Sequence, residues 1–336
     1  SVCVLSEGSM LLAAAWQLRD RGFTVAPNVK LPERLVTAAR EEALVRFDSL
    51  SSDVARLGVH PLSRCYLFSE IATRQKNRFD MRLPSMARED GTLHESPALA
   101  ELCQTAAELA APVIEQVHTE LPLRRDDSWR AARRLSPARP RLDSTGVILS
   151  QPSASAQRFH ADASRRHFAL ASVLPRHRLY NVFVPLVDIA ANTCGTQFWP
   201  GSHLERSRVR RYRKVVSRSG HVEDDAVAMR EMEAPACPAG SMLIFDYRVL
   251  HRGLANEGHD AAPRPIAYAV CSTGWAKDDA NFPQRSLRAA VATLPTTPEE
   301  LSRVQGAISE QFPLWEAVPE RETDPHARSA DTVETV

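Results

Sequence analysis

Residues 240–253 read Gly-Ser-Met-Leu-Ile-Phe-Asp-Tyr-Arg-Val-Leu-His-Arg-Gly, an apolar run that leads within a few residues to His251. The run Met242–Phe245 has the length and composition of a buried strand. Other short apolar runs from residue 144 onward are broken by Pro, Gly, Asn and Ser: Gly146–Leu149, Asn181–Val187, Gln197–Trp199 and Ile266–Ser272. This pattern predicts an all-β core over residues 144–285.

The chain before this core has a helical pattern. Apolar residues recur at helical spacing over 9–21, 31–49 and 96–119, which predicts three helices. Residues Phe23–Val29 predict a strand between the first two. The Arg- and Pro-rich stretch 122–141 is typical of a surface loop.

The chain after the core adds one more helix. It is predicted over 298–311, where Thr297 and Glu300 have the spacing of a capping box. Helices followed by strands favour a β-barrel with N-terminal helices packed on one side, an α+β, mainly β fold. We therefore expect one domain over residues 1–318, helical through 143, and a polar, flexible tail at 319–336.

Composition narrows the class of protein. The 336 residues carry a net charge of +1 and are 43% apolar, which favours a globular protein and argues against both a nucleic-acid and a membrane partner. The six cysteines form no CxxC pair, so we expect reduced thiols and an intracellular, cytoplasmic protein. The apolar run Met10–Trp16 is too short to span a bilayer. Targeting to an organelle is compatible with the sequence.

Three residues have the types that a metal site requires. His160 and Asp162 stand two positions apart, and side chains at i and i+2 of a strand point to the same face. With His251 they would complete the two-histidine, one-carboxylate set of non-haem Fe(II) oxygenases. HxD alone is a weak signal, because a hydrogen-bonded histidine is the commoner explanation. The order of HxD, Gly-rich turn and buried strand leading to His251 favours the metal site.

Arg264 lies thirteen residues after His251. A strand, a turn and the start of the next strand would return its guanidinium to the metal. A guanidinium can bind a carboxylate through two parallel hydrogen bonds, as the distal carboxylate of 2-oxoglutarate requires. The alternative is an ordinary surface arginine.

The same segments resemble a known family. GVILSQPSASAQRFHAD (146–162), NVFVPLVDIAANTCGTQFWPGSH (181–203) and GSMLIFDYRVLHRGLANEG (240–258), followed by PRPIAY (263–268), are similar in order and content to the phytanoyl-CoA dioxygenase family of Fe(II)- and 2-oxoglutarate-dependent oxygenases. The resemblance implies a double-stranded β-helix, or jelly roll. It also implies that His160, Asp162 and His251 hold the iron and that Arg264 binds 2-oxoglutarate.

The resemblance also implies roles for other residues. Gln157 and Thr196 match positions that contact the cosubstrate in fungal members, and the Pro200–His203 turn matches a signature to which we assign a structural role. Two departures occur. Ser153-Ala154-Ser155 replaces a segment that usually holds glycine, and Gly253 has no side chain that could donate to the cosubstrate.

These features together predict a dioxygenase that uses Fe(II), 2-oxoglutarate and O₂, with ascorbate as a helpful reductant. It would hydroxylate or otherwise oxidise an unactivated C–H bond of a small organic substrate, releasing succinate and CO₂, as a monomer or homodimer. The rival interpretations are an inactive jelly-roll binding protein, a hydrolase with another metal and a nucleic-acid-binding module that uses the basic stretch 204–218.

Substrate contacts are the least constrained part of the sequence. Residues 204–218 hold six arginines and a lysine, which would suit a lid over an anionic substrate; a solvated loop is the simpler explanation. Four further residues are candidates for the substrate mouth: Tyr180, Arg252, Trp275 and Lys277.

Overall fold

The fold is built on one large antiparallel sheet. The computed structural model describes residues 7–84, 96–119, 139–164, 167–168, 177–204, 212, 214–216, 220–257, 261–274, 276–278 and 281–315. Seven strands follow the order β1-β7-β5-β9-β4-β3-β2. Their bounds are β1 Phe23–Lys30, β2 Ile71–Gln75, β3 Arg78–Arg82, β4 Arg141–Ser150, β5 Leu179–Pro185, β7 Ser241–Asp246 and β9 Arg264–Ser272.

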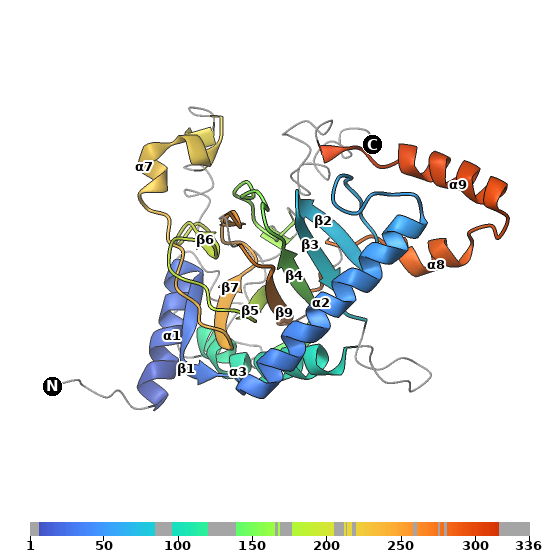
Figure 1. Cartoon of the computed structure of the whole chain (residues 1–336). Coiled ribbons are helices and arrows are strands. Elements are labelled where there is room, and N and C mark those ends of the chain that lie inside the picture. Colours follow the sequence, from blue (N-terminus) through green and yellow to red (C-terminus); the bar gives the residue numbers. More distant parts are fainter. Residues whose placement is uncertain are drawn as a thin grey trace.

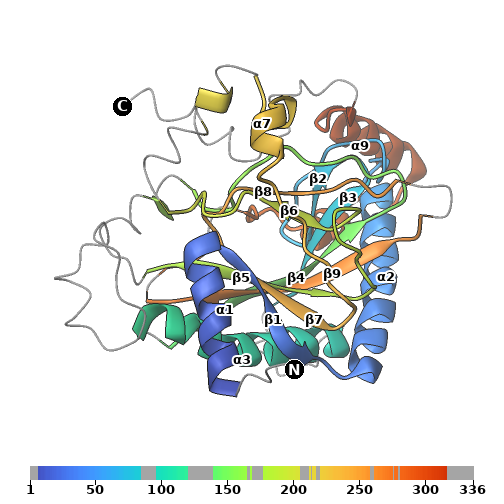
Figure 2. The same cartoon turned by 90° about the vertical axis from the view of Figure 1, so that its left-hand side faces the viewer.

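A smaller sheet lies across the barrel from this one (Figure 2). It pairs β6 (Thr196–Phe198) with β8 (His251–Gly253). Isolated bridges extend it on both sides, from His251 to His160 and from Phe198 to Glu233. The two facing sheets make the jelly roll that the family resemblance implies, and the smaller sheet carries both predicted metal-binding histidines.

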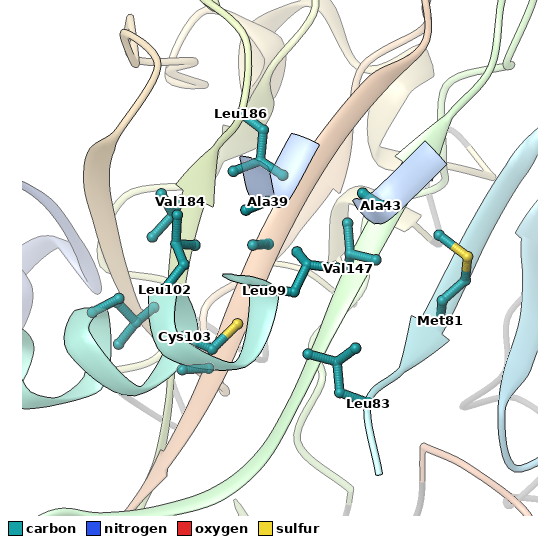
Figure 3. Packing of buried hydrophobic residues seen from close by; sticks show 14 of the residues in the cluster. Ala39, Ala43, Met81, Leu83, Leu99, Leu102, Cys103, Val147, Val184 and Leu186 are labelled. Carbon is teal, nitrogen blue, oxygen red and sulfur yellow. The ribbon is translucent and has the colours of Figure 1, made fainter. Parts of the chain in front are cut away.

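Three helices cover the outer face of the large sheet (Figure 1). They are α1 (Glu7–Arg21), α2 (Glu33–Arg56) and α3 (Pro97–Thr119). In Figure 3, Leu99 and Leu102 of α3 and Ala39 of α2 pack against Val147 and Val184 of the sheet, all in one buried cluster. Since β5, β7 and β9 are buried on both faces, their sequences read as continuous apolar runs rather than alternating ones.

The predicted elements agree closely with the structure. The second helix begins at Glu33 because Pro32 is its N-cap, and it continues to Arg56 rather than ending at residue 49. The helix predicted at 298–311 is α9 (Pro298–Glu310). Its capping box is wrong in detail: the Thr297 hydroxyl donates to Glu300 at 2.8 Å and caps no backbone N–H.

Some elements were not predicted. Besides β2, β3 and β8, the structure adds the short helices η1 (Val222–Asp224), α7 (Ala226–Met229) and α8 (Leu287–Ala292). Residues 122–138 of the predicted loop and the tail at 319–336 lie outside the described residues, so the domain boundaries stay predictions. In the part of the chain that is described, no helix combines the length and the apolar character that crossing a bilayer requires.

Candidate active site

The two predicted metal-binding histidines lie side by side, His251 on β8 and His160 in the segment that is bridged to it. His160 and His251 exchange backbone N–H···O hydrogen bonds of 2.9 and 2.8 Å. Asp162 follows directly, and its two oxygens lie 3.7 Å from His160 Nε2 and 3.6 Å from His251 Nε2. The ligand atoms of all three residues lie within 4.8 Å of one another. One cation of ordinary bond length can therefore contact all three.

Backbone carbonyls determine which nitrogen of each imidazole carries a proton. The Arg158 carbonyl lies 2.8 Å from His160 Nδ1, and the Val249 carbonyl lies 3.0 Å from His251 Nδ1. A carbonyl only accepts, so each Nδ1 carries the proton and each Nε2 keeps a lone pair for a metal. Asn181 Nδ2 donates to Asp162 Oδ2 at 2.6 Å and orients the carboxylate. The donor set and its orientation thus fit Fe(II) before any ion binds.

A cavity of about 820 Å³, including its mouth open to solvent, adjoins the three residues. Arg78 and Arg264 lie together at one part of its wall, and Arg74 lies with phenols and carboxylates at another. The lining residues are Arg74, Arg78, Asp80, Ile148, Gln157, His160, Asp162, Asn181, Phe183, Gly195, Thr196, Tyr247, His251, Gly253, Arg264, Ile266, Tyr268, Asp278, Asn281 and Phe282. The predicted cofactor residues Arg264, Gln157 and Thr196 are all among them.

Two buried guanidiniums share the cationic part of this wall. Arg264 and Arg78 are 4% and 3% exposed, and both donate to the Leu254 carbonyl, at 3.1 and 2.6 Å. No described carboxylate lies within ion-pair distance of either. Burial, and then the neighbouring charge of Arg264, lowers the pKa of Arg78 to about 9. Burial also lowers the pKa of Arg264, although Cys194 opposes the shift. Uncompensated charges of this kind favour an anionic ligand.

Gly253 allows this part of the wall to close. It pairs with Thr196 across the smaller sheet, and its N–H donates to Gln157 Oε1 at 3.1 Å. A Cβ at Gly253 would lie 2.4 Å from Arg78 Nη1 and 2.7 Å from Gln157 Oε1. The departure from the family pattern at this position therefore has a physical reason, since any side chain would displace the two neighbours.

A comparison with models of protein families identifies the family of this chain. The model of the family described as phytanoyl-CoA dioxygenase (PhyH) matches residues 19–265, a span that includes His160, Asp162, His251 and Arg264. The chain belongs to the phytanoyl-CoA dioxygenase family. It is accordingly an enzyme of the class of iron- and 2-oxoglutarate-dependent oxygenases.

The similar solved structures share little sequence identity with this chain. AviO1 from Streptomyces viridochromogenes Tue57 is 15% identical, with 82% of this chain and 98% of that chain covered and a TM-score of 0.44. The α-ketoglutarate-dependent epimerase SnoN from nogalamycin biosynthesis is 16% identical, covering 87% and 92%, with a TM-score of 0.45. EctD from S. alaskensis is 14% identical, covering 80% and 76%, with a TM-score of 0.44. These low scores assign no particular reaction to the chain.

Several residues predicted to contact substrate do not reach the cavity of this dioxygenase. Tyr180 faces the helices, where its hydroxyl hydrogen-bonds with His118 Nε2 at 3.0 Å; the alternation of β5 places Asn181 in the cavity instead. Arg252 points away from its neighbours His251 and Gly253, and its Nε donates to Gln197. Lys277 is exposed and absent from the lining. The structure does not bring these three residues to the cavity lining, and a part for them in substrate binding stays a prediction.

Other predictions have different outcomes. Trp275 and most of the basic stretch 204–218 lie outside the described residues. His203 is buried, with Nε2 3.0 Å from the Arg19 carbonyl, which ties the signature turn to the end of α1; this agrees with the structural role assigned to the turn. Ser153 adopts the left-handed conformation, with φ of 62°, in the segment where the family usually has glycine.

The sequence analysis missed the polar residues that β2 and β3 contribute to the cavity. Arg78 and Asp80 alternate with the buried Phe79 and Met81, which is a strand signal with a polar inner face. That signal was present in the sequence, but a five-residue strand with charged inward positions resembles a surface loop when read alone. Tyr247 and Asp278, which meet across 31 positions of sequence, gave no local signal.

Proposed function

We propose that the chain binds Fe(II) through His160, Asp162 and His251 and oxidises an unactivated C–H bond of a small organic substrate. Arg264 would hold the distal carboxylate of 2-oxoglutarate, with Gln157 and Thr196 beside it. The observation that carries the proposal is the fixed tautomer of both histidines, with the two Nε2 atoms 3.7 and 3.6 Å from the Asp162 oxygens. Buried histidines that serve packing alone have no need of this convergence.

Iron held by these residues would supply, with 2-oxoglutarate and O₂, the oxidising chemistry that a C–H bond requires, with succinate and CO₂ as coproducts. The protein contributes position and shielding. Asn181 holds the Asp162 carboxylate in one orientation. Phe245 and Phe198 pack against the His251 ring at centroid distances of 4.9 and 5.9 Å and exclude water from its inner side. Hydroxylation, desaturation and ring formation are all compatible with this arrangement.

The proposal is tested by anaerobic loading with Fe(II) and 2-oxoglutarate. Chelation of Fe(II) by a 2-oxo acid with open coordination positions produces a weak visible band near roughly 500 nm. The wild type should show it, His160→Ala should lose it, and Arg264→Ala should need at least about tenfold more 2-oxoglutarate.

Two matched controls separate this result from general damage. His221→Ala removes a histidine outside the cavity, and Arg303→Ala removes an exposed arginine of α9; both should keep the wild-type band. A folded wild type that binds no Fe(II) would refute the proposal and leave a jelly-roll binding protein.

A further inference from the structure

A group of three polar side chains lines the same cavity as the metal-binding residues without any part in the proposed iron or cosubstrate site. Asp278 is at its centre. Tyr247 Oη donates to Asp278 Oδ2 at 3.1 Å, and Asn281 Nδ2 donates to Asp278 Oδ1 at 2.8 Å. Burial, followed by the charge on Asp278, raises the pKa of Tyr247 well above its ordinary value. The phenol therefore stays protonated and remains a hydrogen-bond donor to the carboxylate.

A second carboxylate of the cavity shows what Asp278 lacks. Asp80 accepts hydrogen bonds from Arg74 Nε and Nη2 at 3.0 and 2.8 Å and from Tyr268 Oη at 2.9 Å. This carboxylate is neutralised by an ion pair. Asp278 has only neutral donors, and among the described residues no lysine or arginine lies within ion-pair distance of it. Because a carboxylate offers about four lone-pair sites, Asp278 can still accept from a ligand.

Further contacts hold the residues around Asp278 and place them close to the proposed iron site. The Ala163 N–H, one residue after Asp162, donates to the Tyr247 carbonyl at 2.9 Å. On the other side, Arg74 Nη2 donates to the Asn281 carbonyl at 2.8 Å. The Phe282 ring lies 4.9 Å from the Arg74 guanidinium. These contacts fix the carboxylate before a substrate arrives, as a recognition group requires.

We propose that Asp278, held by Tyr247 and Asn281, is a substrate-recognition group and that the substrate presents to it a hydrogen-bond donor, either a hydroxyl or an ammonium. The inference rests on the proposed function, because it places this donor in the cavity beside the iron. An anionic group at this point would meet the oxygens of a carboxyl group that has no cationic partner among the described residues. The donor chemistry therefore replaces the anionic substrate that the basic stretch 204–218 suggested.

The test uses three probes with one carbon skeleton: cyclohexylamine, cyclohexanol and cyclohexanecarboxylate. At pH 7 the amine is protonated and the acid is ionised. Each probe is titrated into the anaerobic Fe(II)–2-oxoglutarate complex of the full chain, and the change in the visible band is measured. The proteins are wild type, Asp278→Asn, Tyr247→Phe and Glu41→Gln. The last variant removes an exposed carboxylate of α2 as a matched control.

The band before any probe is added reports the proposed function alone. If wild type forms no band, the proposed function fails and the inference fails with it. If the band forms, the two donor probes should change it with Kd of about 1 mM, usual for ligands of this size. The carboxylate should bind at least about tenfold more weakly. Asp278→Asn should weaken the ammonium at least about tenfold and the alcohol less, whereas Glu41→Gln should match wild type.

The relative affinities of amine and alcohol identify the donor, since the probe that binds more tightly carries the donor group that we expect in the substrate. Three results would overturn the inference while leaving the proposed function intact. They are equal binding of the donors to wild type and Asp278→Asn, preferential binding of the carboxylate, and no response to either donor up to about 100 times the expected Kd. If Asp278→Asn does not form the band, Tyr247→Phe decides, because it leaves the carboxylate charge in place and should weaken the alcohol by about threefold to tenfold.

Discussion

Replacing Gly253 by alanine should damage both the stability of the fold and the cosubstrate site. The added Cβ would lie 2.4 Å from Arg78 Nη1, about 1 Å closer than ordinary van der Waals contact. Arg78 cannot move aside freely, because its guanidinium donates to Ser150 Oγ at 2.8 Å and to the Leu254 carbonyl at 2.6 Å. Either the β8 backbone or the guanidinium must shift.

The size of the effect follows from these contacts. Overpacking of a filled interior costs about 1–3 kcal/mol, and a lost hydrogen bond from a charged donor costs about 1.5–3 kcal/mol. Partial relaxation will share the two costs, so we expect the free energy of unfolding to fall by about 2–4 kcal/mol. Arg264 shares the Leu254 carbonyl with Arg78, so the affinity for 2-oxoglutarate should fall about tenfold as well.

Urea unfolding and titration of the visible band with 2-oxoglutarate measure the two effects. Gly306→Ala in α9 is the matched control, because nothing lies within 4 Å of a Cβ at that position. In a helix interior this exchange should stabilise the protein by up to about 1 kcal/mol. A Gly253→Ala variant with the stability and the 2-oxoglutarate affinity of wild type would show that the close approach at β8 does not shape the site.

Four further predictions concern single contacts. Asn181→Ala should lower Fe(II) affinity about 10- to 100-fold by freeing the Asp162 carboxylate, measured by Fe(II) titration. Arg264→Lys should raise the Kd for 2-oxoglutarate at least about tenfold, because an ammonium cannot make the two parallel hydrogen bonds. Tyr180→Phe should reduce stability to urea by about 1 kcal/mol and leave 2-oxoglutarate affinity unchanged. Burial lowers the pKa of His203 to about 3, so stability should fall as the pH drops from about 6.5 toward 3, and less so in His203→Gln.

The candidate metal site could be located in the sequence because its signal is local and chemical. HxD places two ligand types at strand spacing, and a buried strand delivers the second histidine. The groups that orient the imidazoles could not be predicted from the sequence. They are the carbonyls of Arg158 and Val249, each two residues before its histidine. Every residue type has a carbonyl, so no sequence pattern marks these two.

The position of Tyr180 relative to the cavity could not be predicted from the sequence, for a reason of strand register. Tyr180 was predicted from its chemistry and its place between the ligand strands, but strand alternation decides which face it takes. On β5 the odd positions Asn181 and Phe183 face the cavity, and Tyr180 packs toward α3. A strand buried on both faces shows no polar–apolar alternation that could fix this parity in advance.

Apart from the Arg74–Asp80 ion pair, the described part of the cavity holds its charged groups in separate places. Arg78 and Arg264 form a cationic part without a carboxylate partner, while Asp278 forms an anionic part without a cationic partner. Each would be stabilised by bringing the other closer. The fold instead places Arg78 on β3, Arg264 on β9 and Asp278 in the irregular segment after β9. Because the two charged parts do not pair with each other, each stays available to a ligand. A dicarboxylate would bind at the arginines, and a hydrogen-bond donor would bind at Asp278. His160, Asp162 and His251 line the same cavity, so two ligands bound in this way would both lie beside the proposed iron site.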